Sequence, residues 1–257
     1  MEIKFKNKAV LITGATSGIG EASADVFAKA EAQVMLTGRN ADKLAALTNS
    51  IQSRNSSVNF FAGDIADAQF RESLIKETID RFGKLDVLVN SAGIIGMGTI
   101  ETTTLEQYDQ MMDINLRSIF HLSQLAVPYL EKTQGNIVNL SSVAGLRSFP
   151  GLLSYCVSKA ALDQMTRCIA LELSPKKIRV NAVNPGVVVT NLHRRSGMPE
   201  ESYQKFVEHS KTTHPIGRVG DPAEIAQLIA YLASDAAGWI TGVTYSIDGG
   251  RALTCFR

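Results

Sequence analysis

The sequence predicts an α/β fold with a doubly wound parallel sheet of about seven strands and helices on both faces. Short apolar segments such as Ala9–Ile12 and Asn136–Leu140 alternate with longer amphipathic segments along almost the whole chain. The strands of a parallel sheet are covered by helices on both faces, so their residues are apolar without alternation. The length of 257 residues and the lack of an internal repeat favour a single domain over residues 1–257.

The expected strands are spaced so that a helix fits between them. In chain order they cover residues 9–12, 34–36, 58–62, 85–89, 136–140, 178–183 and 243–247. The expected helices cover residues 19–30, from 40 onward, 67–82, 104–130, 152–173 and from 221 onward. Asn40 is a good N-cap type, Asp67 opens the third expected helix, Thr104 and Gln107 have capping-box spacing, and Asp221 precedes a proline at the first helical position. A long stretch without strand signal predicts a substrate lid at about residues 187–215.

Composition excludes several classes of function. The 26 Lys+Arg residues nearly balance the 25 Asp+Glu residues, so no strong field would attract nucleic acid or an anionic membrane. No apolar run approaches the roughly 20 residues that a membrane span needs, and the first residues lack a signal-peptide core. Cys156, Cys168 and Cys255 are scattered, which argues against a disulfide framework or a thiolate metal site. We expect a cytoplasmic protein without a metal, nucleic acid or membrane partner.

The strongest local motif follows the first strand. The segment 13–20 has glycines at Gly14, Gly18 and Gly20 and runs directly into a helix. Glycines let the backbone approach a pyrophosphate closely, and the helix N-terminus offers unpaired N–H groups. A turn that merely needs glycine is the alternative, but the position in the first strand–helix turn favours a Rossmann-type dinucleotide site.

The end of the second expected strand bears on the choice of cofactor. In this architecture an acidic residue about twenty residues beyond the glycines would hold a free ribose 2′-hydroxyl. This chain instead has Arg39 and no carboxylate there, and a guanidinium can bind a phosphate in a bidentate manner. We therefore expect NADP(H) as the preferred cofactor, with NAD(H) as the second choice. A solvated surface charge is the alternative for Arg39.

A tyrosine and a lysine share one face at the start of a later helix. Tyr155 and Lys159 are four residues apart, and Ser142 closes the fifth expected strand. Alone, each has an ordinary explanation: a packing residue, a surface charge and a turn residue. Together they place a phenol, an ammonium and a hydroxyl near the crevice at the carboxyl ends of the strands.

Taken together, these motifs resemble the short-chain dehydrogenases/reductases over essentially the whole chain. The segments that carry the resemblance, in the order and spacing of that family, are 13–20, 90–93, Asn115, 137–142, 155–159 and 184–186. The resemblance implies a catalytic tetrad of Asn115, Ser142, Tyr155 and Lys159. A buried amide that satisfies backbone groups is the alternative for Asn115. Ser91 departs from the asparagine that most members have at that position.

The resemblance also implies a set of cofactor contacts and an assembly. The implied cofactor-binding residues are Gly14, Thr16, Ser17, Gly18, Ile19, Gly20, Arg39, Asp64, Ile65, Asn90, Ala92, Gly93, Tyr155, Lys159, Pro185, Gly186, Val188 and Thr190. Family members are usually homotetramers built through the two long helices and the last strand, so we expect the same assembly here.

The implied reaction is hydride transfer between NADP(H) and a ketone or secondary alcohol. Tyr155 is the expected general acid or base, and Lys159 is expected to depress its pKa. The expected substrate-binding residues are Ser142, Leu146, Leu152, Tyr155, Leu192 and His193. Their apolar surroundings favour a hydrophobic substrate such as a steroid or isoprenoid.

Two alternatives share the same residues. A β-ketoacyl thioester reductase would use the same tetrad, and Arg194 and Arg195 would then meet an acidic acyl carrier; two solvated lid charges are the simpler reading of this pair. A catalytically silent NADP(H)-sensing module would not need the phenol and the ammonium. For His193, a surface position is the alternative to a substrate contact.

Overall fold

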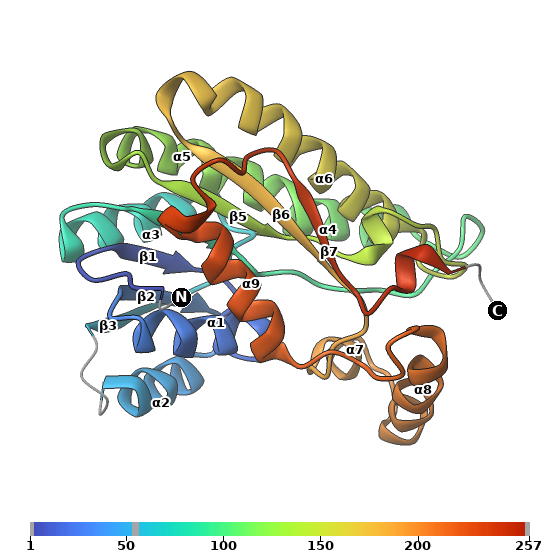
Figure 1. The fold of residues 1–257 in the computed structure, drawn as a ribbon. Coiled ribbons are helices and arrows are strands. Elements are labelled where there is room, and N and C mark those ends of the chain that lie inside the picture. Colours follow the sequence, from blue (N-terminus) through green and yellow to red (C-terminus); the bar gives the residue numbers. More distant parts are fainter. Residues whose placement is uncertain (1–2, 53–56, 255–257) are drawn as a thin grey trace.

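The structure is a computed structural model that describes residues 3–52 and 57–254. Within these residues, seven parallel strands form one sheet in the order β3-β2-β1-β4-β5-β6-β7 (Figure 1). The strands are β1 (Ala9–Ile12), β2 (Gln33–Gly38), β3 (Val58–Ala62), β4 (Val87–Asn90), β5 (Asn136–Leu140), β6 (Arg179–Pro185) and β7 (Thr244–Ile247). The predicted fold class is confirmed. Because the strand order reverses at β1, the crevice beyond the carboxyl ends of β1 and β4 is where such sheets bind ligands.

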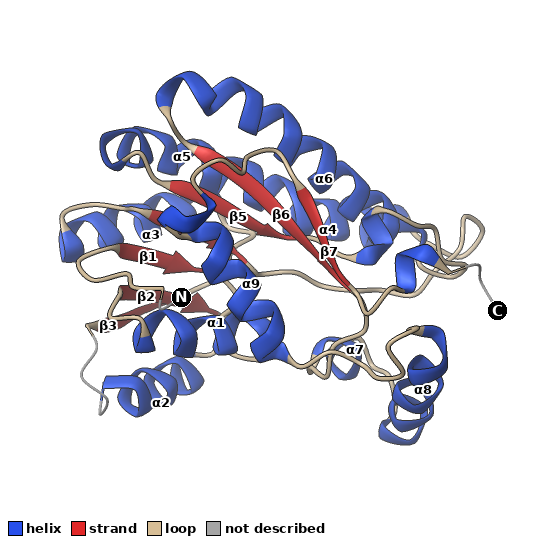
Figure 2. Cartoon of the chain, viewed as in Figure 1, coloured by secondary structure: helices blue, strands red, loops and turns tan. Residues whose placement is uncertain are grey.

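Helices cover both faces of the sheet (Figure 2). The longer ones are α1 (Gly18–Lys29), α2 (Ala41–Gln52), α3 (Ala68–Phe82), α4 (Leu105–Met112), α5 (Ser118–Thr133), α6 (Leu153–Leu173), α8 (Glu200–Thr213) and α9 (Pro222–Ala233). Helices α1, α2 and α9 enclose one hydrophobic core, which contains Phe27 and Ile229. Helices α3, α5 and α6 enclose a second core on the other face, which contains Leu74 and Leu122.

The predicted helix starts are borne out at their caps. The Asp67 carboxylate accepts from the N–H of Gln69, and complete capping boxes begin α4 at Thr104 and α9 at Asp221. A single uninterrupted helix over residues 104–130 is wrong in one respect. A π-helical segment, Asp113–Arg117, separates α4 from α5 and carries the buried Asn115. One extra residue in a helical turn redirects a side chain, and such insertions often occur at functional sites.

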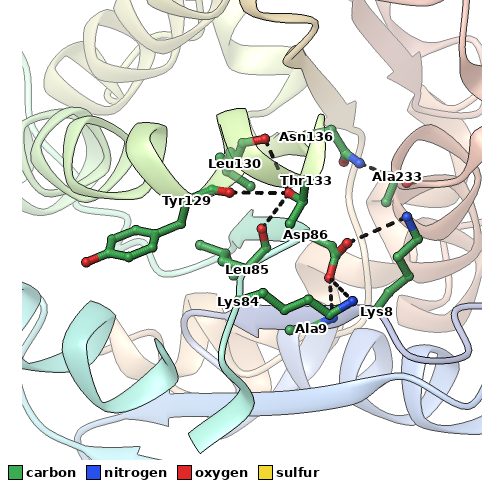
Figure 3. A network of polar contacts seen from close by, with 10 residues as sticks. All are labelled: Lys8, Ala9, Lys84, Leu85, Asp86, Tyr129, Leu130, Thr133, Asn136 and Ala233. Carbon is green, nitrogen blue, oxygen red and sulfur yellow. Dashed lines mark hydrogen bonds and ion pairs between the residues drawn. The ribbon is translucent and has the colours of Figure 1, made fainter. Parts of the chain in front are cut away.

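A polar network joins the sheet at the amino ends of its strands, opposite the carboxyl ends where the site is expected (Figure 3). The buried carboxylate of Asp86 accepts from the N–H of Ala9 at 2.8 Å and so joins the starts of β1 and β4. Lys8 and Lys84 lie 3.6 and 3.3 Å from its oxygens and compensate its charge. The amino ends of β1 and β4 are thus fixed by charge pairing. The carboxyl ends of the strands are left for function.

The stretch after β6 is the segment where the lid is predicted, and we keep that name for it. It contains the short helix α7 (Leu192–Arg195) and α8, which lie beyond the carboxyl ends of β6 and β7 (Figure 1). No helix in the described part of the chain combines the length and apolarity needed to cross a membrane. Cys156 and Cys168 are free thiols, and Cys255 lies outside the described residues.

Candidate active site

The turn after β1 packs against the loop after β4. The hydroxyl of Thr13 accepts from the N–H groups of Ser91 and Ala92, each at 3.0 Å. Gly14 has a φ of 69°, and a Cβ on it would lie 2.8 Å from the backbone N of Ala92. Only glycine fits this close approach of two backbones without strain. The two loops therefore form the floor of one cleft at the carboxyl edge of the sheet.

The residues of this cleft fit a dinucleotide. Seven of the predicted cofactor residues line it: Gly14, Thr16, Arg39, Asp64, Ile65, Ala92 and Gly93. Ser17, the N-cap of α1, makes no side-chain cap, so the first-turn N–H groups of this helix are available to an anion. A Cβ on Gly18 would lie 3.0 Å from Cγ2 of Thr190, which places the start of the lid against the glycine turn.

Two predicted cofactor residues, Arg39 and Asn90, differ in how far their side chains are exposed. Arg39 is exposed at the end of β2, and no ion pair holds its guanidinium among residues 3–52 and 57–254. Asn90, in contrast, is 1% exposed, and its amide donates to Oδ1 of Asn139 at 2.9 Å. The side chain of Asn90 thus lies in the interior of the sheet, and the contact of this residue with the cofactor stays a prediction.

The structure brings the predicted tetrad together beside the same cleft. Tyr155 and Lys159 lie in the first turns of α6, where the Lys159 Nζ atom is 5.8 Å from the centroid of the Tyr155 ring. Ser142 follows β5 and is close enough to Tyr155 for its hydroxyl to lower the pKa of the phenol. A Cβ on Gly93 would lie 3.7 Å from Lys159 Nζ and 3.3 Å from Asn115 Oδ1. The cleft therefore reaches the tetrad.

Burial governs the ionisation of the phenol and the ammonium. It raises the pKa of Tyr155 to about 12, an effect that the Ser142 hydroxyl only partly opposes. It lowers the pKa of Lys159 to about 8, and the charge of Asp163 opposes that shift. Desolvation is thus the largest influence on the pKa of Tyr155. The expected depression of that pKa by Lys159 stays a prediction.

Asn115 is fully buried and holds the loop that follows β4. Its Oδ1 accepts from the N–H of Ile94 and its Nδ2 donates to the Ile94 carbonyl, both at 2.9 Å. The same Nδ2 lies 3.1 Å from Oγ of Ser158 on α6. Asn115 is thus a buried amide that satisfies backbone groups, as the alternative for this residue predicted. It fixes the cleft wall next to Lys159, which is compatible with a place in the tetrad.

The surroundings of Tyr155 are apolar. Tyr155, Met111 and Ala144 form a buried cluster against which five partly buried side chains pack: Ile94, Ile95, Phe149, Leu152 and Cys156. Leu146 is 42% exposed. The predicted contact Leu152 therefore lies with Tyr155, and the place of Leu146 in a substrate site stays a prediction.

The residues of the lid pack on one another. The His193 ring is half-buried, and its centroid lies 4.6 Å from that of Phe206 and 6.5 Å from that of Tyr203, so it is not the surface histidine of the alternative. Its contact with a substrate stays a prediction. Arg194 binds both carboxylate oxygens of Glu200, at 2.7 and 2.9 Å, and stacks over the Tyr203 ring. Arg195 lines the dinucleotide cleft. These two arginines are thus not an equivalent pair of solvated charges.

Sequence reasoning missed His214, which connects the lid to the loop after β6. Its ring is buried, Nε2 accepts from the N–H of Val187 at 3.0 Å, and Nδ1 lies 2.6 Å from the Ser210 carbonyl. A Cβ on Gly186 would lie 2.7 Å from Nε2. His214 thus holds the predicted nicotinamide loop with a neutral ring. Its position directly before Pro215, at the end of a long polar helix, was the available signal.

This contact predicts an acid-sensitive stability. Burial lowers the pKa of His214 below its ordinary value of 6.5, so the unfolded chain takes up the proton first. Stability supplied by the neutral ring is complete above about pH 6.5 and is lost as the pH falls below that value. We expect the melting temperature to drop less between pH 7.5 and 5.5 in His214→Gln than in the parent. His209→Gln, at an exposed position of the same helix, should behave as the parent; equal slopes in all three proteins would refute the assignment.

Comparison with known proteins places the chain in a family. The family model described as "Enoyl-(Acyl carrier protein) reductase" matches residues 14–252. The chain is a short-chain dehydrogenase/reductase. This dehydrogenase/reductase is 36% identical over 252 residues to the 3-oxoacyl-[acyl-carrier-protein] reductase FabG of Thermotoga maritima, covering 98% of this chain and 100% of that one. It is 35% identical over 263 residues to the 3beta-hydroxysteroid dehydrogenase of Mediterraneibacter gnavus, covering 96% and 95% of the two chains.

A solved structure gives the same result for this short-chain dehydrogenase/reductase. A short-chain dehydrogenase/reductase of unknown function from Caenorhabditis elegans, solved with cofactor, matches with a TM-score of 0.92 and 36% identity over 98% of this chain and 97% of that one. The protein is an oxidoreductase that acts on CH–OH donors and the corresponding ketones with NAD(P)(H). Across the described residues, no group of three or more His, Cys, Asp or Glu side chains could hold a metal ion.

Proposed function

We propose that this protein is an NADP(H)-dependent oxidoreductase that interconverts a ketone and a secondary alcohol on a hydrophobic substrate, such as a steroid or isoprenoid. The observation that carries the proposal is the convergence of Ser142, Tyr155 and Lys159 beside a dinucleotide cleft. A binding module that only senses the cofactor would need neither the phenol nor the ammonium.

Each residue of the tetrad has a separate task in this proposal. When bound, the nicotinamide gives or accepts the hydride. Tyr155 supplies a proton to the carbonyl oxygen during reduction, and the pKa of about 12 keeps the phenol protonated and able to donate at neutral pH. Ser142 donates a hydrogen bond to the oxygen on which negative charge develops. Lys159 binds the nicotinamide ribose and, by its charge, favours ionisation of Tyr155 in the oxidative direction. Asn115 keeps the adjoining loop in place.

The remaining cofactor contacts follow from position. Pro185, Gly186, Val188 and Thr190, at the end of β6 and the start of the lid, would lie along the nicotinamide half. Ser17, Gly18, Ile19 and Gly20, at the start of α1, would surround the pyrophosphate. Asp64 and Ile65 would meet the adenine, since both line the cleft next to Arg39.

Arg39 carries the proposed preference for NADP(H). We expect Arg39→Asp to lower the ratio of kcat/KM for NADPH to that for NADH by roughly 10- to 100-fold, because a charged hydrogen bond contributes about 1.5–3 kcal/mol. Steady-state kinetics with both cofactors, and Kd values from NAD(P)H fluorescence, measure this change. Arg147→Asp, an exposed arginine of the segment after Ser142, is the matched control. An unchanged ratio in Arg39→Asp would show that Arg39 does not read the phosphate.

The choice of substrate rests on the apolar cluster around Tyr155. Phe149, Leu152 and Leu146 offer carbon surface to a ring system, and the steroid dehydrogenase relative is consistent with such a ligand. The acyl-carrier-protein reductase relative favours a β-ketoacyl thioester as the second candidate. The engagement of Arg194 with Glu200 and Tyr203 weakens that candidate, because it leaves this arginine less able to meet an acidic carrier.

A ketone panel tests the proposed function. Oxidation of NADPH is followed by absorbance with steroid ketones, short aliphatic ketones, and an acetoacetyl thioester on acyl carrier protein. We expect the highest kcat/KM with the steroid ketones. Preference for the carrier thioester would favour the second candidate, and cofactor binding without turnover of any member would favour the sensing module.

Assembly, domain and location complete the proposal. We expect a homotetramer of single-domain subunits, since the edge strand β7 exposes Tyr245 and the neighbouring surface exposes Trp239 and Leu171. Light scattering after size exclusion measures the assembly.

The free thiols of Cys156 and Cys168 are consistent with a reducing compartment such as the cytoplasm.

A further inference from the structure

One turn of α6 beyond Lys159, a carboxylate lies buried behind the tetrad. Asp163 follows Lys159 by one turn of α6 and is 1% exposed. A buried carboxylate is costly unless charges or hydrogen bonds compensate it. Residues i and i+4 of a helix are neighbours on one face, so the Asp163 carboxylate and the Lys159 ammonium share the interior side of α6.

The surroundings of Asp163 hold its carboxylate in one place. Its Oδ2 accepts from Nδ2 of Asn184 on β6 at 2.8 Å, and its Oδ1 is buried without a hydrogen-bond partner. The same Asn184 nitrogen donates to the backbone carbonyl of Ser142 at 2.9 Å. A Cβ on Gly145 would lie 2.4 Å from Oδ2 and 2.9 Å from the Lys159 carbonyl oxygen, so the chain after Ser142 passes directly over both residues.

Lys159 needs a compensating charge. It is 4% exposed, and its Nζ donates to the neutral carbonyl of Leu140 at 2.8 Å. Burial lowers the pKa of Lys159 to about 8, and the negative charge of Asp163 opposes this shift. Burial also raises the pKa of Asp163, whereas hydrogen bonds from Ser141 and Asn184 and the charges of Lys159 and Arg167 lower it.

The charged groups around this pair are few. In the described parts of the chain, those that act on Asp163 are Lys159 and the exposed Arg167, both on α6. The elements packed against it from β5, β6 and the turn after Ser142 contribute Ser141, Asn184 and backbone, all uncharged. Asp163 is therefore the nearby anion on which a positive Lys159 depends.

We propose that Asp163 is a positioning residue that acts through Lys159: its buried carboxylate keeps the Lys159 ammonium charged behind the active site, and thereby sets the pH range in which Tyr155 can ionise. This inference rests on the proposed roles of Tyr155 and Lys159. A purely structural role, in which Asp163 only anchors Asn184 and through it Ser142, is the competing explanation.

Asp163→Asn separates the two explanations. The amide oxygen of the asparagine can still accept from Asn184, so the anchor of Ser142 is kept while the charge is removed. Without that charge Lys159 loses its proton at lower pH, and Tyr155 ionises at higher pH. At an effective dielectric of about 20, a unit charge roughly 6 to 10 Å away, the range open to side chains one helical turn apart, moves such a titration by roughly one to two pH units, and we take the lower value.

Two quantities are measured as a function of pH in Asp163→Asn, in the parent and in Glu172→Gln. The first is kcat for alcohol oxidation, whose rising limb we expect roughly one pH unit higher in Asp163→Asn. The second is the Kd for NADPH, from its fluorescence; its weakening with rising pH should begin roughly one unit lower. The Kd needs no turnover, so it tests Asp163 even if the proposed reaction fails. Glu172→Gln neutralises an exposed acid at the far end of α6 and should match the parent in both.

The outcomes decide between the explanations. Opposite shifts of the two profiles in Asp163→Asn alone support the proposal. Superimposable profiles overturn it, as does a uniform fall of kcat at every pH with a lowered melting temperature, which would show a structural anchor only. If Asp163→Asn does not fold, Asp163→Ser, which leaves room for water beside Asn184, is subjected to the same two measurements and the same criteria.

Discussion

Tyr155→Phe is expected to lower kcat by about a thousandfold or more while leaving the Kd for NADPH within a few-fold of the parent. The substitution removes one hydroxyl from a ring that is 7% exposed and packed against Met111 and Ala144, so the cluster keeps its shape. What is lost is the proton that reaches the carbonyl oxygen. The measurement is single-turnover NADPH oxidation with a reactive ketone, together with cofactor fluorescence.

The matched control for this variant is Tyr231→Phe. Tyr231 is partly buried on α9, on the opposite face of the sheet, and the same hydroxyl is removed there without approaching the cleft. Turnover in Tyr155→Phe within tenfold of the parent would refute the assignment of Tyr155 as the proton donor. A large fall in Tyr231→Phe as well would indicate that hydroxyl loss acts through stability.

Gly14→Ala is expected to weaken NADPH binding at least roughly 100-fold and to destabilise the fold by about 2–5 kcal/mol. The new Cβ would lie 2.8 Å from both N and Cα of Ala92, and backbone atoms cannot rotate aside as a side chain can. The two loops that floor the cleft must therefore separate. Thermal unfolding should show a decrease in melting temperature of roughly 5–15 °C.

Gly83→Ala distinguishes backbone strain from this clash. Gly83 has a φ of 73° at the end of α3, close to the 69° of Gly14, but a Cβ there would meet nothing within 4 Å. It should cost about 1–2 kcal/mol and leave the Kd for NADPH unchanged. Equal losses of stability and of cofactor affinity in the two variants would mean that the contact with Ala92 is unimportant.

The features that could be predicted from the sequence are those that short segments encode. Apolar strands, the caps at Asp67 and Asp221, and the glycine turn each depend on neighbouring residues, and the structure has them where they were expected. The position of Ser142 at the carboxyl end of β5 was predictable from the strand pattern, and its approach to Tyr155 was implied by the family resemblance.

Contacts between distant segments could not be predicted in the same way. The hydrogen bond from the Val187 N–H to His214 joins residues 27 apart, and that from Asn184 to Asp163 joins residues 21 apart. Nothing in the local sequence marks Asp163 as buried, since an aspartate on an amphipathic helix is ordinarily solvated. The π-helical turn at Asn115 likewise depends on the loop that this side chain holds, which lies 21 residues earlier.

The self-packing of the lid has a consequence for how such enzymes diversify. Its aromatic residues contact one another, the Tyr203 hydroxyl donates to the Thr190 carbonyl at 3.3 Å at one end, and His214 secures the other. Between these two attachment points, residues can be exchanged without touching α6, the helix that carries the proposed proton donor. A change of substrate can therefore arise by replacing a segment of about twenty residues, while the catalytic residues stay the same.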